Sequence, residues 1–295
     1  MQDSQFSMSL HGSVAAVLER AIGLLAAAGV PSPQADAELL IGHHLGLSRG
    51  AVQAKAITGE LLNASQCAAI DGLIERRAAR EPLQHITGRA AFRSIELAVG
   101  PGVFVPRPET EAVAGIAIDA LRAYENPQPI AVDLGTGSGA IALAMAHEVP
   151  NARVFGVEVA PLAFAYTKQN FRTIAPLNAT PVFIDLAVAL PELDGTVSVV
   201  TSNPPYIPAA AIPRDPEVRL FDPEIALYGG DDGMDVMRTV STTAKRLLHR
   251  GGTLVVEHGE LQAAQVAQLL AADGWSAVTG HRDLLGRDRA TSALR

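Results

Sequence analysis

The stretch Ile130-Ala-Val-Asp-Leu134-Gly-Thr-Gly-Ser-Gly139, which continues into Ala140-Ile-Ala-Leu-Ala-Met145, decides the fold of this chain. Its apolar run predicts a buried strand, its glycines predict a tight loop, and its alanine-rich continuation predicts a helix. Such a loop lets the backbone approach a ligand closely, which indicates a cofactor site. The spacing of Gly135, Gly137 and Ala140 also fits a dinucleotide fingerprint, so the loop alone leaves the cofactor open.

Outward from this loop, strands and helices alternate along the chain. Strands are expected near residues 130–134, 153–158, 181–185, 197–202, 252–257, 275–281 and 289–294. Helices are expected near residues 139–147, 161–172, 232–249 and 260–272. This alternation predicts an α/β fold with a mainly parallel sheet covered on both faces, in which ligands bind beyond the carboxyl ends of the strands.

The part before this alternation has a different pattern. Residues 1 to about 85 are expected to form helices only, over about 14–28, 33–46 and 63–81. Alternating apolar residues around Gly100-Pro101-Gly102 predict a β-hairpin, and a helix is expected from about 109 to 123. The predicted domains are therefore residues 1–85, a hairpin linker over 86–108, and residues 109–295.

Composition narrows the class of protein. A chain of 295 residues with 48% hydrophobic residues suits two domains and a large core. The single cysteine, Cys67, allows no internal disulfide, which fits a cytoplasmic protein. Met1 to Gly12 show no secretory signal pattern, and no apolar run is long enough to predict a membrane span. The adjacent His43 and His44 cannot share a helix face, so no metal site is expected.

The turn Asn203-Pro204-Pro205-Tyr206 follows the expected strand 197–202 and indicates the chemistry. A planar –NH₂ group is a poor nucleophile that offers two N–H donors, and the Asn203 side-chain oxygen and the Pro204 carbonyl can accept them. The prolines fix φ and remove competing N–H groups, and Tyr206 can stack on the flat group. Asn and Pro are also common in plain surface turns, so the turn is interpreted together with the loop.

Acidic residues near the loop help to distinguish the cofactor. Glu158, at the end of the second strand, can bind a ribose in either a nicotinamide nucleotide or S-adenosylmethionine. Asp133 can face an amino-acid moiety, and Gly139 leaves room for methionine, so we favour S-adenosylmethionine. Asp185-Leu186 are expected beside the adenine, although Asp185 also suits a turn cap. The predicted cofactor residues are Asp133, Gly135, Thr136, Gly137, Ser138, Gly139, Glu158, Asp185, Leu186 and Asn203.

With both motifs in view, nearly the whole chain resembles the bacterial peptide chain release factor glutamine methyltransferases. The segments that carry the resemblance are Asp36-Ala-Glu-Leu-Leu40, Glu81-Pro-Leu-Gln-His-Ile-Thr-Gly88, Phe104-Val-Pro-Arg-Pro-Glu-Thr-Glu111, Asp133-Leu-Gly-Thr-Gly-Ser-Gly139, Ser202-Asn-Pro-Pro-Tyr-Ile207, Asp222-Pro-Glu-Ile-Ala-Leu-Tyr-Gly-Gly230, Asp232-Gly-Met234, Glu257-His-Gly259 and Asp283-Leu-Leu-Gly-Arg-Asp-Arg289. The Pro-Arg-Pro-Glu-Thr-Glu segment is the most specific of these, because adenine methyltransferases share the Asn-Pro-Pro-Tyr turn.

The resemblance implies a seven-stranded Rossmann-like class I methyltransferase domain behind a small all-helical domain that helps to recognise the substrate. It implies that S-adenosylmethionine methylates the side-chain amide nitrogen of the glutamine in the Gly-Gly-Gln motif of release factors. Asn203, Pro204 and Tyr206 would be catalytic, and Asn203 to Tyr206 would hold the substrate glutamine. Glu158 stands where Asp is more frequent, and Leu186 stands where some relatives carry an aromatic residue.

Other interpretations stay open at this point. An adenine methyltransferase acting on DNA or RNA would use the same turn, but would want a basic groove with exposed aromatics. The net charge of −8 and the 4% aromatic content argue against it and against direct nucleic-acid binding. A nicotinamide-dependent oxidoreductase and a non-catalytic binding module are weaker alternatives. Arg107 and Glu109 suit either a salt bridge or a substrate contact, and Glu257-His258 are expected to be a solvated strand end.

Overall fold

The computed structural model describes residues 10–175 and 177–295, so most of the segment Met1 to Gly12, where no secretory signal is expected, lies outside the described residues. The described chain divides into two compact units. The helical unit contains the chain up to Gly88 together with Asp215–Phe221, and the sheet unit contains Arg89–Arg214 and Asp222–Arg295. No helix of the described residues has the length and apolarity to cross a membrane.

The helical unit is built mainly from α1 (Val14–Ala27), α2 (Pro33–Leu45), α3 (Arg49–Thr58), α4 (Ala64–Ala78), α5 (Leu83–Thr87) and α9 (Pro216–Phe221). Helices α1, α2 and α4 confirm the three expected helices. The expectation of helices only is wrong, because β1 (Leu10–Ser13) pairs antiparallel with β2 (Leu61–Asn63). Ser13 and Asn63 are extended N-cap residues that accept hydrogen bonds from the first turns of α1 and α4, and the extended segments leading into both helices pair with each other.

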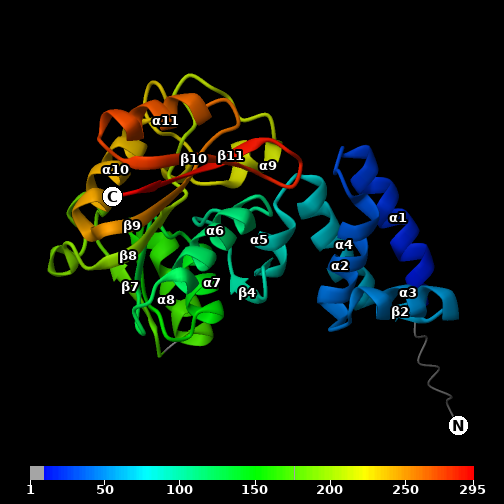
Figure 1. The fold of residues 1–295 in the computed structure, drawn as a ribbon. Helices are drawn as coiled ribbons and strands as arrows, with labels where there is room; N and C mark the ends of the chain where they lie inside the picture. The colour runs from blue at the N-terminus through cyan, green and yellow to red at the C-terminus, as the bar shows by residue number, and fades with distance from the viewer. Residues whose placement is uncertain (1–9, 176) are drawn as a thin grey trace, which may run out of the picture. The chain divides into compact units, whose positions relative to one another are not determined.

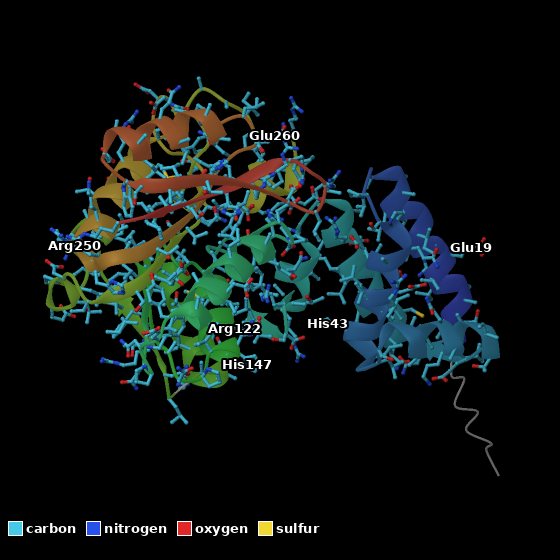
Figure 2. The ribbon with its side chains drawn as sticks, viewed as in Figure 1. Glu19, His43, Arg122, His147, Arg250 and Glu260 are labelled. Carbon is cyan, nitrogen blue, oxygen red and sulfur yellow. The ribbon has the colours of Figure 1, made fainter. Side chains whose placement is uncertain are left out.

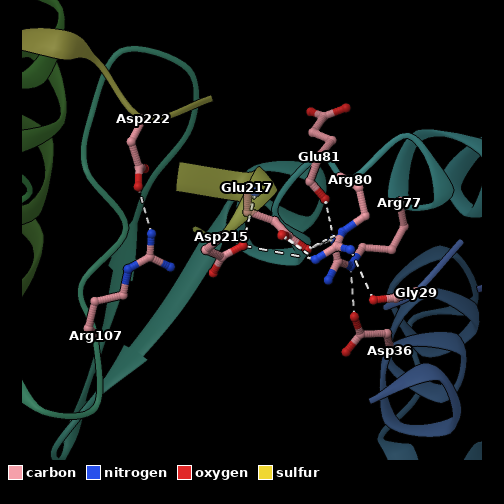
Figure 3. Close-up of polar contacts among 9 residues, drawn as sticks. All are labelled: Gly29, Asp36, Arg77, Arg80, Glu81, Arg107, Asp215, Glu217 and Asp222. Atoms are coloured by element: carbon pink, nitrogen blue, oxygen red, sulfur yellow. Dashed lines mark hydrogen bonds and ion pairs between the residues drawn. The ribbon is translucent and has the colours of Figure 1, made fainter. Parts of the chain in front are cut away.

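Helix α9 belongs to the helical unit although it follows the Asn203 turn in sequence. Its Glu217 accepts hydrogen bonds from Arg77 Nη1 at 2.8 Å and from Arg80 Nε at 2.7 Å (Figure 3). Arg77 also donates to Asp36 of α2, at 2.7 Å. Arg77, Asp36 and Glu217 are buried, so this charged cluster fixes α9 against the helices of its unit.

The sheet unit contains the predicted seven strands. They are β5 (Ile130–Leu134), β6 (Arg153–Glu158), β7 (Ala179–Phe183), β8 (Val197–Ser202), β9 (Leu248–Glu257), β10 (Ser276–Arg282) and β11 (Asp288–Leu294). Their order in the sheet is β10-β11-β9-β8-β5-β6-β7. Strands β9, β8, β5, β6 and β7 are parallel to one another. Strand β11 is antiparallel to both of its neighbours, β10 and β9. The expected α/β fold class with an N-terminal helical region is confirmed.

Helices cover both faces of the sheet (Figure 1). One face packs against α6 (Thr110–Ala123), α7 (Ala140–Glu148) and α8 (Pro161–Ile174), and the other against α10 (Asp235–Leu247) and α11 (Ala263–Ala272). Successive residues of β8 alternate between the two buried clusters, with Val199 in one and Val200 in the other. Three short 3₁₀ turns, η1 (Leu186–Val188), η2 (Pro191–Leu193) and η3 (Glu224–Ala226), lie between the main elements.

The expected hairpin is formed by β3 (Arg89–Phe92) and β4 (Ile95–Ala98), and it belongs to the sheet unit. Its turn lies at Arg93-Ser94, where Arg93 has φ of 51°, so the expectation that it centres on Gly100-Pro101-Gly102 is wrong. The amide of Asn170 binds both the N–H and the carbonyl of Ala98, at 2.8 and 2.9 Å. These bonds occupy the backbone at the end of β4, and the chain continues as a loop that leads to α6.

The strand order places the two sequence motifs next to each other. From β5 the chain builds β6 and β7 on one side, and then returns to build β8 and β9 on the other side. The last residues of β5 and β8, Leu134 and Ser202, are therefore paired neighbours. The glycine loop and the Asn203 turn both begin at this switch point, where ligands bind in sheets of this kind.

Candidate active site

The glycine loop, residues 135–139, turns back sharply after β5. Gly135, Gly137 and Gly139 have φ of 73°, 58° and 92°, a region that favours glycine. A Cβ added at Gly135 or Gly137 would meet nothing within 4 Å, so this side of the loop is open to a ligand. A Cβ at Gly139 would lie 2.8 Å from Phe171. Gly139 therefore serves close packing of α8, and the expectation that it leaves room for methionine stays a prediction.

Asp133 connects the loop to the neighbouring strand. It is buried, and it accepts hydrogen bonds from the hydroxyls of Thr136 at 2.6 Å and Thr201 at 2.8 Å. Burial raises the pKa of the Asp133 carboxyl to about 6, although both hydroxyls act in the opposite direction. Thr136 belongs to the loop and Thr201 to β8, so the Asp133 carboxyl holds the loop and the neighbouring strand together at the switch point. Its expected contact with a cofactor stays a prediction.

Glu158, the last residue of β6, lies on the other side of the loop. One of its carboxylate oxygens accepts from Gly137 N at 2.9 Å, and the other accepts from Val159 N and Ala160 N. A carboxylate has about four acceptor positions, so about one is left for a further donor. The side chain of Glu158 thus reaches back to bind the loop itself.

Two buried residues of α8 also hold the loop, and sequence reasoning missed both. Thr167 donates to the Gly137 carbonyl at 2.6 Å, and Asn170 donates to the Ser138 carbonyl at 2.8 Å. Because Asn170 also binds Ala98, a single amide joins the loop to the β3–β4 hairpin. The available signal was two polar residues spaced i, i+3 on an otherwise apolar helix face.

Asp185 and Leu186 lie beyond β7, which ends at Phe183 rather than at Asp185 as expected. Asp185 is exposed and accepts a hydrogen bond from Ala187 N at 2.9 Å, so it caps the short turn η1. Leu186 is half-buried against the cluster under α10 and α11. The turn-cap interpretation of Asp185 is therefore observed, and the adenine contact of both residues stays a prediction.

The Asn203 turn, residues 203–206, is fixed by hydrogen bonds on both sides. Before it, Ser202 Oγ donates to the Leu134 carbonyl at 2.7 Å. After it, the Tyr206 carbonyl accepts from Gln262 Nε2 at 2.9 Å, and Ile207 N donates to the Leu227 carbonyl at 2.9 Å. Sequence reasoning assigned no role to Gln262, which also accepts from Gly259 N at 3.0 Å.

A second glycine-rich segment packs directly behind the turn. A Cβ on Gly229 would lie 2.4 Å from the Pro205 carbonyl oxygen, and a Cβ on Gly233 would lie 2.3 Å from that of Tyr206. Only glycine allows backbone to approach backbone this closely. This explains Gly229 and Gly233, for which the sequence alone offered no physical reason.

Two acceptors of the turn remain available. Among the described residues, neither Asn203 Oδ1 nor the Pro204 carbonyl accepts a hydrogen bond. Asn203 Nδ2, in contrast, points to Thr110 Oγ1 at 3.5 Å. Thr110 is the first residue of α6 and is buried, so the Pro-Arg-Pro-Glu-Thr-Glu segment brings a hydroxyl to the turn. The sequence marked this segment without indicating its role there.

Ion pairs hold the surrounding segments. Arg107 pairs with Asp222 at 2.6 Å (Figure 3). Its guanidinium lies 5.0 Å from the centre of the Phe104 ring. Glu109 pairs with Arg287 at 2.8 Å. Of the interpretations left open for Arg107 and Glu109, the salt bridge is the one observed. It joins the start of α6 to the loop after α9 and to the β10–β11 connection.

Glu257 and His258 are 2% and 0% exposed, so the expected solvated strand end is wrong. Strand β11 runs antiparallel beside this end of β9, with Ala290 paired to Glu257, and covers it. His258 is placed between the Thr291 hydroxyl, 3.0 Å from Nε2, and the Gly259 carbonyl, 2.9 Å from Nδ1. Burial lowers the pKa of His258.

The six side chains labelled in Figure 2 are all exposed: Glu19, His43, Arg122, His147, Arg250 and Glu260. Within residues 10–175 and 177–295, no three His, Cys, Asp or Glu side chains gather as metal ligands would.

Comparison with known proteins identifies the class of the sheet unit. A family model described as a methyltransferase domain matches residues 131–214, which contain both motifs. Together with the sheet order, this match defines the chain as a methyltransferase of class I fold. A second family model, described as the PrmC N-terminal domain, matches residues 16–88.

Similar proteins specify the family. A release factor glutamine methyltransferase from Streptomyces coelicolor is 48% identical over 276 residues, which are 92% of this chain and 94% of the relative. One from Bifidobacterium longum is 41% identical over 94% of this chain and 98% of the relative. A solved release-factor-specific protein-(glutamine-N5) methyltransferase from Alicyclobacillus acidocaldarius is 28% identical, covering 67% of this chain and 98% of that chain, with a TM-score of 0.42. The chain belongs to the release factor glutamine methyltransferase family.

Proposed function

We propose that this chain methylates the side-chain amide nitrogen of a release factor glutamine, within a Gly-Gly-Gln motif, and that the Asn203 turn holds that amide. The observation that carries the proposal is the pair of open acceptors, Asn203 Oδ1 and the Pro204 carbonyl. The two carbonyls that follow are occupied, because Gly229 packs against that of Pro205 and Gln262 donates to that of Tyr206. A primary amide offers two N–H donors, and these two acceptors match them.

The residues at the switch point fit S-adenosylmethionine as the methyl donor. Gly135 and Gly137 present a side of the loop where no side chain intrudes, and Glu158 keeps about one acceptor position for a ribose hydroxyl. Asp185 and Leu186 would flank the adenine. When bound, S-adenosylmethionine supplies a methyl group already activated by its sulfonium. The predicted cofactor residues remain part of this proposal.

The task of the turn is to orient the amide nitrogen. Proximity and orientation can contribute roughly 7–11 kcal/mol to a reaction between two bound groups. As the nitrogen attacks, it becomes more positive, so its hydrogen bonds to Asn203 Oδ1 and the Pro204 carbonyl strengthen in the transition state. Tyr206 would hold the amide plane. Burial, with Glu257 nearby, raises the pKa of Tyr206 to about 12, so its phenol stays neutral and acts by position.

The helical unit is proposed to recognise the release factor, because a Gly-Gly-Gln loop alone offers little surface. The matching test compares a whole release factor with a short Gly-Gly-Gln peptide. A large preference in kcat/KM for the whole protein is expected, and equal values would contradict recognition beyond the loop. A cytoplasmic location, expected from the sequence, belongs to the same proposal.

The decisive experiment incubates the protein with radiolabelled S-adenosylmethionine and, separately, a release factor, its glutamine-substituted variant, DNA and RNA. Label is expected on the release factor and not on the glutamine variant. Label on DNA or RNA alone would instead support the adenine alternative, which no observation on this site favours.

A further inference from the structure

Glu257 is a buried acid beside the substrate turn, and the proposed mechanism does not use it. It is the last residue of β9, whose Val256 is paired with Ser202 of β8, so Glu257 follows directly beside Asn203. It is 2% exposed, and among the described residues its Oε2 atom has no hydrogen-bond partner. A buried carboxyl with an unsatisfied oxygen is costly, which calls for a functional reason.

The hydrogen bonds around Glu257 have a fixed direction. Thr110 and Asn203 lie close enough to the Glu257 carboxyl for hydrogen bonding from their side chains to lower its pKa. An ionised carboxylate only accepts, so Thr110 gives its single proton to Glu257 and turns a lone pair toward Asn203. That lone pair faces Asn203 Nδ2, at 3.5 Å. Only the –NH₂ group of Asn203 can donate to both the Glu257 carboxylate and the Thr110 hydroxyl oxygen. If the amide were flipped, Oδ1 would face these two acceptors and neither would receive a proton.

We propose that Glu257 is a positioning residue for Asn203: with Thr110 it holds the amide nitrogen of Asn203, and so turns Oδ1 toward the substrate amide. This inference rests on the proposed role of Asn203. Without the carboxylate, no charged acceptor fixes the orientation of the Asn203 amide. In the flipped orientation it would offer the substrate a donor where an acceptor is needed, and the Thr110 hydroxyl, then free to donate to Oδ1, would stabilise that orientation.

Protonation of Glu257 would have the same effect, because a carboxylic acid can donate to Oδ1 and stabilise the flipped amide. Burial raises the pKa of Glu257 to about 7, while the hydrogen bonds from Thr110 and Asn203 and the charge of Arg289 act against it. The negative charge of Glu109 raises the pKa of Glu257 further. The ionised form is the active one, so kcat should rise with pH through about 7 and then level off.

The test compares Glu257→Gln with the wild-type full-length protein, using a release factor as substrate. At pH 8 the variant should lose about 10- to 100-fold in kcat, the range for a hydrogen bond to a charged group. Its KM for the release factor and its Kd for S-adenosylhomocysteine should stay within about twofold, and its pH profile should lose the rise near 7. A variant with wild-type kcat, or with the same rise, would overturn the proposal.

Two further sets of variants keep the test decisive. Thr110→Val removes the hydroxyl but preserves the shape, and should lower kcat, whereas Thr110→Ser should restore it; equal rates for both would contradict the network even if Glu257→Gln folds poorly. Burial also raises the pKa of Asp133 to about 6, so Asp133→Asn is the control. A rise that vanishes in Asp133→Asn and persists in Glu257→Gln would assign it to Asp133. Full activity of Asn203→Ala would refute the proposed role of the turn itself.

Discussion

Replacing Glu217 by Gln is expected to destabilise the helical unit without any change of side-chain volume. Glu217 is 7% exposed and accepts from Arg77 Nη1 and from Arg80 Nε and Nη2. The variant keeps one acceptor oxygen and loses the charge. It also sets an amide –NH₂ group against guanidinium donors, so at least one buried donor loses its partner.

The magnitude follows from the same contacts. Burial raises the pKa of Glu217, but hydrogen bonding with Arg80, Asp215 and Arg77 outweighs burial and lowers it from 4.5 to about 2. Two and a half pKa units correspond to about 3 kcal/mol, similar to the cost of breaking a buried ion pair. The loss of stability should not exceed about 3 kcal/mol. Arg77 keeps Asp36 as a partner, and Arg80 keeps the Gly29 carbonyl.

The pH dependence has a definite sign. The folded pKa lies below the unfolded value, so the stabilisation is complete above about pH 4.5 and is lost as the pH falls toward 2. The wild-type protein and Glu217→Gln should therefore differ by about 3 kcal/mol at pH 7 and by about 1 kcal/mol at pH 3.

Urea unfolding at both pH values, followed by a helix signal, measures this difference. Glu19→Gln is the matched control, since Glu19 is an exposed acid of the same unit with no ion pair among the described residues. The reasoning is refuted if Glu217→Gln unfolds at the same urea concentration as Glu19→Gln at pH 7, or if its deficit is as large at pH 3 as at pH 7.

The remaining predictions concern the sheet unit. Asn203→Ala should nearly abolish methyl transfer while cofactor affinity, measured by calorimetry, stays within a few-fold; normal turnover would sink the mechanism. Asn170→Ala removes one hydrogen bond from α8 to the loop and two from α8 to the hairpin, and should weaken S-adenosylhomocysteine binding by about tenfold or more, a loss of about 1.4 kcal/mol; an unchanged Kd would show that the loop needs no such support. Gly229→Ala would force a Cβ to within 2.4 Å of the Pro205 carbonyl oxygen, so it should lower kcat and cost about 1–3 kcal/mol of stability. Gly72→Ala, which meets nothing within 4 Å, is its control, and equal behaviour of the two variants would contradict the packing argument.

Much of the fold could be predicted from local pattern. The central strands β5 and β8 are short, mostly apolar runs, and burial on both faces requires such a run whatever the rest of the chain does. Because the glycine loop follows β5 and the Asn203 turn follows β8, both motifs could be assigned to strand ends, and the family resemblance could be stated from them. The interrupted hairpin was misplaced, because Gly and Pro mark turns without showing which strands they join.

The sequence by itself determined the seven strands, the loop, the turn and the family to which they belong. Only the tertiary structure decided that Asn170 binds both the loop and a hairpin 72 residues away, that α9 joins the helical unit, and that Thr110 and Glu257 meet at Asn203. Local periodicity records which face of an element is buried. It does not record which distant element covers that face, and a buried polar group acquires its partner, its charge state and its role only from that element.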